Sequence, residues 1–285
     1  MKEYTLIKSD DDLIQYRKYI DHSNITIVSM DFEGEYNLHI YGETLCLIQI
    51  YDGNKYFVID PFGISKDELA KTLEDRKIMK IFYDANSDSK LLYKQYGIKM
   101  QAVYDLKLLV DLLDFERKGL DAVISGLLGI TISKKKQFQR YNWTVRPVDK
   151  DAMQYALSDV EHLFVLKKKL FEMIEQEGKT EELINSIIKK SVDFDRKTIP
   201  GILKSFDYRK LRSAEKNLLK KIFEIREEIA KELNVPPNLV MTKSQLFGAS
   251  KDFQTIKNLD FNRRIPRNIR NKFIRQLERI EDVRQ

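Results

Sequence analysis

The stretch Ile25-Thr26-Ile27-Val28-Ser29-Met30-Asp31-Phe32-Glu33 decides the fold class of this 285-residue chain. Its first four residues are β-branched, which predicts a strand. Because residues i and i+2 of a strand point to the same face, Asp31 and Glu33 lie side by side at its end. Two like charges this close are costly unless a cation lies between them, and hard oxygen ligands suit Mg²⁺ or Mn²⁺. In the other interpretation, the pattern only marks a strand that leaves the core.

Working outward, the first half of the chain alternates between strand and helix patterns. Asp52-Gly53-Asn54 is a strong hairpin turn signal between two apolar runs. Further strands are expected at 45–51, 55–59, 77–83 and 103–105, and helices at 12–20, 66–75, 87–96, 106–113, 119–127 and 149–177. This order predicts an α/β domain with a mixed sheet flanked by helices.

Strand signals end near residue 181, and the remainder is helical with breaks at Pro200-Gly201 and Pro236-Pro237. We therefore expect an α/β domain over 1–175, a helical linker over 176–205 and an all-α domain over 206–285. The net charge of +6 is uneven, because residues 201–285 carry an excess of nine positive charges. A basic second half suggests a phosphate-binding module, although a solvated helical surface explains the same excess.

Composition excludes several classes of protein. Cys46 is the one cysteine, so a disulfide within the chain and a cysteine-based zinc cluster are excluded. No stretch approaches 18 apolar residues, and the first residues lack the apolar core of a signal peptide, so no membrane association and a cytoplasmic location are expected. Neither a G-x-G-x-x-G motif nor a P-loop occurs, and no organic cofactor is expected.

Two further motifs carry acids. Asp88 is expected in the first turn of a helix that follows a buried strand, where it could bind metal or simply stabilise the helix dipole. Tyr155 and Asp159 are four residues apart and share a helix face, so a carboxylate could bind a metal while the phenol orients a water. Ordinary helix decoration is the alternative. Each motif alone is weak.

Together, these motifs resemble the DEDD exonuclease superfamily in its tyrosine variant, since the histidine variant would place a His where Gln154 stands. Their order and spacing resemble the exonuclease domain of the ribonuclease D family. Leu45–Ile50, Tyr104-Asp105 and Trp143–Pro147 resemble further segments of that family, and the resemblance covers roughly 10–170. The tail resembles a helicase-and-RNase-D C-terminal (HRDC) domain, a small helical nucleic-acid-binding module. Its pattern includes Leu218, Leu219, Phe223, Arg226 and Ala230.

The resemblance implies a ribonuclease H-like fold and a 3′→5′ exoribonuclease. In that family the residues corresponding to Asp31, Glu33, Asp88 and Asp159 hold two Mg²⁺ or Mn²⁺ ions, and Tyr155 orients the attacking water. The implied partner is RNA with a free 3′ end, such as a tRNA precursor, and the product is a nucleoside 5′-monophosphate. The sequence departs from the family pattern at Gly34 after the first motif and at Tyr83-Asp84, where a His is usual.

A basic segment with interleaved aromatic residues lies at 131–150. Such side chains neutralise phosphates and stack on unpaired bases. We expect substrate contacts from Lys135, Lys136, Trp143 and Arg146. The alternatives are a core position for Trp143, which the sequence favours, and a solvated loop for the lysines, for which phosphate contacts are favoured. Two other functions stay open: a DNA 3′→5′ exonuclease of the same superfamily, and a non-catalytic RNA-binding adaptor, which predicts a damaged acidic set.

Overall fold

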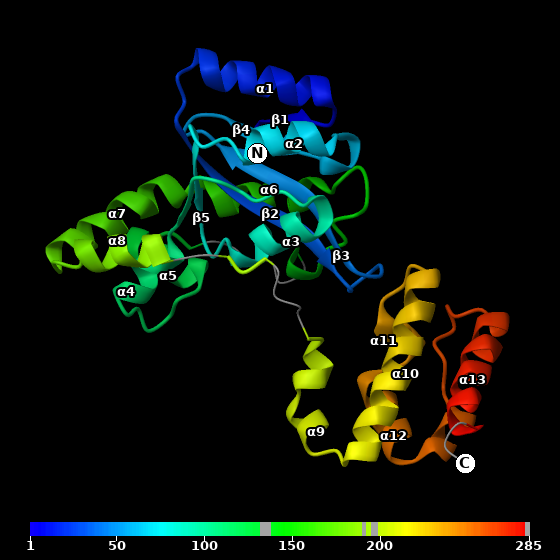
Figure 1. Ribbon diagram of the computed structural model, residues 1–285. Coiled ribbons are helices and arrows are strands. Elements are labelled where there is room, and N and C mark those ends of the chain that lie inside the picture. The colour runs from blue at the N-terminus through cyan, green and yellow to red at the C-terminus, as the bar shows by residue number, and fades with distance from the viewer. Residues whose placement is uncertain (132–137, 190–191, 195–198, 283–285) are drawn as a thin grey trace. The chain divides into compact units, whose positions relative to one another are not determined.

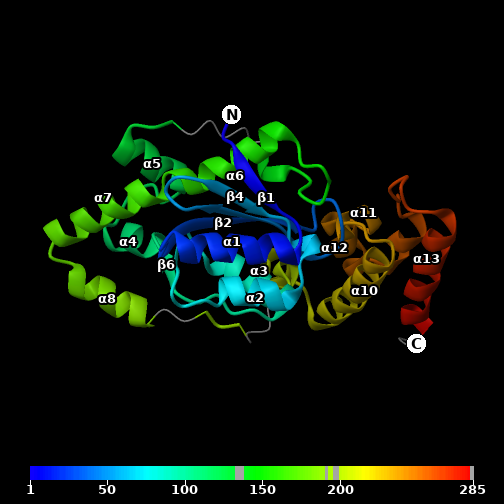
Figure 2. The ribbon, with the colours of Figure 1, turned by 90° about the horizontal axis from the view of Figure 1, so that it is seen from above.

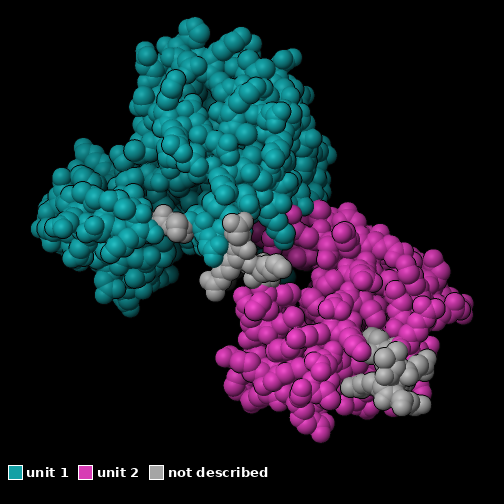
Figure 3. Space-filling model, viewed as in Figure 1, with its two compact units in different colours: residues 1–34, 44–194 teal, residues 35–43, 195–285 magenta. Residues whose placement is uncertain are grey.

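The computed structural model describes residues 1–131, 138–189, 192–194 and 199–282. Contacts divide the chain into two units (Figure 3): residues 1–34 and 44–194 form the first, and residues 35–43 and 195–285 form the second. The boundary after residue 194 falls inside the segment 176–205. No helix in the described part of the chain has the length and apolar character needed to cross a membrane.

The first unit is built on a six-stranded mixed sheet with the order β1-β4-β3-β2-β5-β6 (Figure 1). β2 pairs with β5, β5 with β6 and β1 with β4 in parallel, whereas β3 and β4 form an antiparallel hairpin. The hairpin turns at Gly53, whose φ of +97° is open to glycine without strain. The strands are β1 (Tyr4–Ile7), β2 (Ile27–Tyr36), β3 (Glu43–Tyr51), β4 (Tyr56–Ile59), β5 (Met79–Phe82) and β6 (Val103–Asp105). The expected mixed sheet is confirmed, and β1 is a strand that the sequence patterns did not reveal.

Helices cover both faces of this sheet (Figure 2). α1, α2 and α3 pack on one face, where Val28, Met30 and Phe32 of β2 are buried. On the other face, α6 buries Ala156 and Leu157 against Leu47 of β3. The helices of this unit are α1 (Asp10–His22), α2 (Lys66–Leu73), α3 (Asn86–Tyr96), α4 (Lys107–Leu112), α5 (Leu120–Leu128), α6 (Lys150–Glu161), α7 (Leu163–Gln176) and α8 (Thr180–Lys189), with 3₁₀ turns at Pro61–Gly63 and Phe138–Arg140.

One expected helix is two. The segment 149–177 breaks at His162, which separates α6 from α7. In an unbroken helix, the carbonyl of Val160 would accept the N–H four residues further on. Here it accepts hydrogen bonds from the N–H of His162 and from the hydroxyl of Ser29 on β2, at 2.8 Å. A tertiary bond therefore accompanies the break, and helix periodicity alone could not reveal it.

The second unit is helical, apart from residues 35–43, which comprise the end of β2, the start of β3 and the residues that connect them. Its central helix, α10, buries one apolar face together with Arg226, whose guanidinium pairs with Glu227 and lies over the ring of Phe223. The buried Leu218, Leu219 and Ala230 lie on that face, as the sequence pattern indicated. The elements are α9 (Phe206–Arg209), α10 (Ser213–Glu232), α11 (Pro237–Val240), α12 (Lys243–Lys251) and α13 (Arg267–Asp282), with 3₁₀ turns at Gly201–Lys204 and Phe253–Asn258.

Candidate metal centre

Asp31 and Glu33 lie on the face of β2 that looks away from α1, α2 and α3. Val28, Met30 and Phe32 are buried on the opposite face, so strand alternation directs the two carboxylates toward α6. Ser29 shares their face and donates its hydrogen bond to the carbonyl of Val160 in α6. This bond ties the acid-bearing strand to the helix that carries the other site residues.

α6 supplies Tyr155 and Asp159. Its N-terminus is capped by Asp149, whose carboxylate accepts the N–H groups of Asp151 and Ala152. One turn separates Tyr155 from Asp159, so both lie on the same helix face. The ring of Phe138 lies 5.5 Å from that of Tyr155, which restricts the orientation of the phenol.

Asp31, Glu33 and Asp159 come together in space. One carboxylate oxygen from each lies within 4.8 Å of the other two, although Asp159 is 128 residues from Asp31 in the chain. Asp31 and Glu33 are half-buried and Asp159 is 7% exposed. Three half-buried to buried carboxylates this close repel one another, and a hard divalent cation is the group that their oxygens fit.

The phenol of Tyr155 faces this acidic group. Burial raises the pKa of Tyr155 above its ordinary value, and the carboxylates of Asp159, Glu33 and Asp31 raise it further, in that order. A phenol in this setting stays protonated at neutral pH. Its hydroxyl can therefore donate or accept a hydrogen bond to a water molecule but cannot serve as an anionic base.

Asp88 stands apart from the three-acid group. It lies in the first turn of α3, which follows β5, the parallel neighbour of β2. This topology places the start of α3 beside the strand that carries Asp31. Asp88 nevertheless does not belong to the group of three acids whose oxygens lie within 4.8 Å of one another. Burial raises the pKa of Asp88 to about 7, with the nearby carboxylates of Asp84 and Asp105 adding to the rise. A cation next to Asp88 would reverse that rise.

Of the basic and aromatic residues predicted to bind substrate, those that the structure describes are not part of this acidic site. Lys135 and Lys136 lie outside the described residues. Trp143 is 2% exposed and packs in a core with Leu47 and Met153, so it cannot stack on a base from this position. The alternative, a core tryptophan, is the correct one.

Arg146 is engaged within the protein. Its Nε and one Nη donate to the carboxylate of Asp60, and its remaining N–H groups donate to the carbonyls of Trp143, Val145 and Cys46. The expected substrate contact therefore gives way to a structural role, because these acceptors already occupy the guanidinium. Nothing in the local sequence around Asp60 points to Arg146, which lies 86 positions away.

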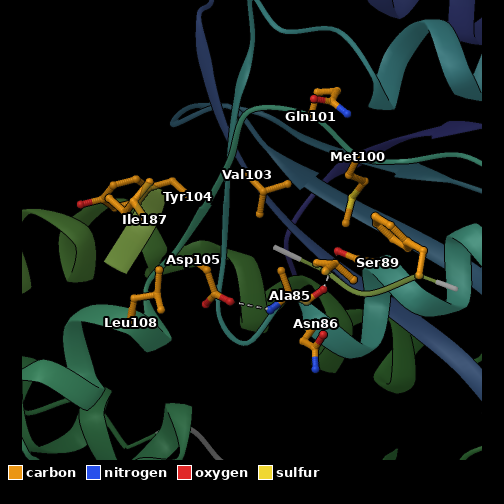
Figure 4. A pocket seen from close by; sticks show the side chains of 12 residues that line it. Ala85, Asn86, Ser89, Met100, Gln101, Val103, Tyr104, Asp105, Leu108 and Ile187 are labelled. Atoms are coloured by element: carbon orange, nitrogen blue, oxygen red, sulfur yellow. Dashed lines mark hydrogen bonds between the residues drawn. The ribbon is translucent and has the colours of Figure 1, made fainter. Parts of the chain in front are cut away.

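A cavity of about 420 Å³ lies beside the start of α3 (Figure 4). None of Asp31, Glu33, Tyr155 and Asp159 lines it. Its walls include Ala85, Asn86, Ser89, Tyr104 and Asp105, together with residues that follow α8. The cavity thus lies behind the turn that leads into the helix of Asp88.

Comparison with known proteins identifies the arrangement. Residues 6–175 match the model of a family described as 3'-5' exonuclease. The chain belongs to the 3′-5′ exonuclease family. Residues 215–258 match the HRDC domain, so this exonuclease family member carries both parts of the expected architecture in the expected order. The resemblance to the ribonuclease D family is thereby confirmed.

Relatives of this 3′-5′ exonuclease family member include ribonuclease D from Gluconacetobacter diazotrophicus, which is 24% identical over 249 residues. The match covers 85% of this chain and 61% of that protein, so the chain spans less than two thirds of the relative's length. The fold matches that of Escherichia coli RNase D with a TM-score of 0.73 at 20% identity, over 98% of this chain and 75% of the other.

A third relative, NrnC from Brucella melitensis, has been solved with bound Mg²⁺. It is 27% identical with a TM-score of 0.50, over 64% of this chain and 87% of the other. Bound to pGG, the same protein matches at 28% identity and a TM-score of 0.51, again over 64% of this chain and 87% of the other.

Proposed function

We propose that this protein is a ribonuclease D-like 3′→5′ exoribonuclease that releases nucleoside 5′-monophosphates. The observation that carries the proposal is the group formed by Asp31, Glu33 and Asp159 within 4.8 Å, next to the phenol of Tyr155, in a domain of the 3′-5′ exonuclease family. A non-catalytic adaptor would have no need to keep these acids together at the cost of their repulsion.

The proposed site holds two divalent ions. Asp31, Glu33 and Asp159 are the proposed ligands of one, and Asp88 would share in holding the other. Such ions, when bound, lower the pKa of a water molecule and offset the charge that develops on the leaving oxygen. Mg²⁺ and Mn²⁺ both fit carboxylate ligands, and a Mg²⁺-bound relative supports the assignment.

The chain's own groups orient the reaction. Tyr155, which stays protonated, would hold the attacking water by a hydrogen bond in line with the terminal phosphodiester. A new P–O bond forms to this water and the bond from phosphorus to the 3′ oxygen of the preceding nucleotide breaks. The products are a nucleoside 5′-monophosphate and an RNA shortened by one residue with a free 3′-hydroxyl.

The proposed substrate is RNA with an unpaired 3′ end, including tRNA precursors and other small structured RNAs. Support comes from the ribonuclease D relatives and from the HRDC domain within the basic second half of the chain. Lys135 and Lys136 are proposed to contact the phosphates, whose neutralisation releases counterions and makes binding dependent on salt.

The test is a degradation assay on 5′-labelled single-stranded RNA in Mg²⁺ or Mn²⁺, with EDTA, a matched DNA and a 3′-phosphate RNA in parallel. Asp31→Ala tests the site, and Asp11→Ala, which removes an exposed acid from the first turn of α1, is the matched control. We expect a metal-dependent 3′→5′ ladder that Asp31→Ala abolishes and Asp11→Ala leaves intact.

Two results would contradict the proposal. DNA degraded faster than RNA would assign the protein to the DNA exonucleases of the superfamily. RNA that is bound but never shortened, with every metal tested, would favour the adaptor. A tRNA precursor with a 3′ trailer, added as a further substrate, would be trimmed to a defined end if the proposed substrate class is right.

A further inference from the structure

The carboxylate of Asp105, at the end of β6, accepts three backbone hydrogen bonds. One oxygen accepts the N–H groups of Asp84 at 2.8 Å and Lys107 at 2.9 Å, and the other accepts the N–H of Ala85 at 3.0 Å. The side chain is 4% exposed, so water replaces none of these bonds easily. Figure 4 shows the carboxylate directed at Ala85 across the turn that leads into α3.

This turn depends on an acceptor from outside its own sequence. The first N–H groups of a helix have no partner within the helix, and the N-cap residue of α3, Ala85, has no side-chain oxygen to offer. Asp84 has a φ of +64°, a left-handed conformation that residues other than glycine adopt at a cost. The bonds that Asp105 accepts hold the backbone in this conformation.

The same carboxylate joins two helix starts. The N-cap residue of α4 is Leu106, which also lacks a capping side chain, and Lys107 at its first turn donates to Asp105. The N–H of Leu106 donates to the carbonyl of Phe82 at 2.9 Å. The ends of β5 and β6 are therefore fixed to each other at the point where α3 begins.

Asp88 lies three residues beyond Ala85, in the first turn that these bonds define. Any rotation or shift of the turn displaces its carboxylate directly, because no further element intervenes between the turn and Asp88. We propose that Asp105 is a positioning residue that holds Asp88 in place for the second divalent ion. This inference rests on the proposed function, and it assigns Asp105 no contact with metal or substrate.

The test compares Asp105→Ala with Asp105→Asn. Alanine removes all three bonds. Asparagine can keep the oxygen that serves Asp84 and Lys107 and loses the bond from Ala85, so it should give an intermediate effect. Asp52→Ala is the matched control, because Asp52 accepts the backbone N–H groups of Asn54 and Lys55 in the β3–β4 turn.

Two readouts are measured on the full chain: Mn²⁺ binding by titration calorimetry without RNA, and kcat and KM on single-stranded RNA. For Asp105→Ala we expect Mn²⁺ affinity at one site to fall about tenfold. We also expect kcat to fall about 100-fold, with KM within twofold of wild type. Asp105→Asn should lie between, and Asp52→Ala should match wild type in both.

A merely structural Asp105 predicts a different result. Stability would fall, but Mn²⁺ binding by the folded protein and kcat would stay within twofold of wild type, as for Asp52→Ala, and this would overturn the inference. A rise in KM alone would do the same. If Asp105→Ala does not fold, Asp105→Asn decides. If wild type degrades no RNA, the proposed function fails, and the Mn²⁺ titration still decides whether Asp105 positions a ligand.

Discussion

Replacing Arg146 by methionine should destabilise the first unit, because all three nitrogens of its guanidinium donate hydrogen bonds within the protein. It donates to Asp60 from Nε at 2.5 Å and from Nη at 3.1 Å, and to the carbonyls of Trp143 and Cys46 at 2.6 and 2.7 Å. Methionine replaces the aliphatic stem but none of these donors.

The magnitude follows from what is left behind. Breaking a buried ion pair costs about 3–5 kcal/mol. The side chains of Arg146 and Asp60 are 28% and 15% exposed, so water recovers part of that cost. The carbonyl of the buried Cys46 also loses its donor, at about 1 kcal/mol or more. We expect the free energy of unfolding to fall by about 2–4 kcal/mol.

The assay is urea denaturation followed by tryptophan fluorescence, since Trp143 is the one tryptophan and its carbonyl accepts from Arg146. Arg140→Met, which removes the same charge from an exposed position, should change stability by less than about 0.5 kcal/mol. Asp60→Asn and the double variant complete a cycle in which the two losses are less than additive. If Arg146→Met leaves stability within 1 kcal/mol of wild type but weakens RNA binding, Arg146 is a substrate contact and the structural assignment is refuted.

Three further predictions concern the site and its sheet. Asp31→Asn should reduce the rate of RNA degradation by about 10³-fold. In EDTA it should raise the free energy of unfolding by about 1 kcal/mol, because repulsion among Asp31, Glu33 and Asp159 is relieved, and a lower stability in EDTA would contradict that repulsion. Tyr155→Phe should lower kcat by about 10²-fold with unchanged Mn²⁺ binding; an unchanged kcat would show that the hydroxyl does not hold the attacking water. Burial lowers the pKa of Lys80 on β5 from 10.5 to about 8. Between these pH values the unfolded chain binds a proton that the folded chain does not, so stability should rise by about 2 kcal/mol from pH 7 to pH 9.5. Lys80→Met should abolish this rise in urea titrations at the two pH values, and an equal rise in both proteins would rule Lys80 out.

Features encoded by neighbouring residues were predictable from the sequence. The β-branched run before Asp31 and the Asp52-Gly53-Asn54 turn both act through their own backbone preferences. Strand alternation places Asp31 and Glu33 on one face of β2, and the helix period places Tyr155 and Asp159 on one face of α6. Of the four expected acids, Asp31, Glu33 and Asp159 come together and Asp88 does not join their group.

Features that depend on distant partners were not. β1 owes its pairing to β4, about 50 residues away, and its four residues carry no strong pattern of their own. The break at His162 accompanies a hydrogen bond from Ser29 to the carbonyl of Val160, 131 residues away. Arg146 shows its charge in the sequence but not the distant carboxylate and carbonyls that occupy its guanidinium, so its structural role could not be told from a substrate contact.

The helical unit is not continuous along the chain. Its residues 35–43 are synthesised early, and the remainder of the unit, from residue 195 onward, follows more than 150 residues later. Within that unit, Tyr41 packs against the helical core and its N–H donates to Asn234. During synthesis, the partners of Tyr41 in the helical core therefore do not exist until more than 150 further residues have been added. A fragment beginning at residue 195 would lack part of its own core. A chain truncated before the helical unit would leave Tyr41 without its partners, and the strand that precedes Tyr41 is β2, which carries Asp31 and Glu33.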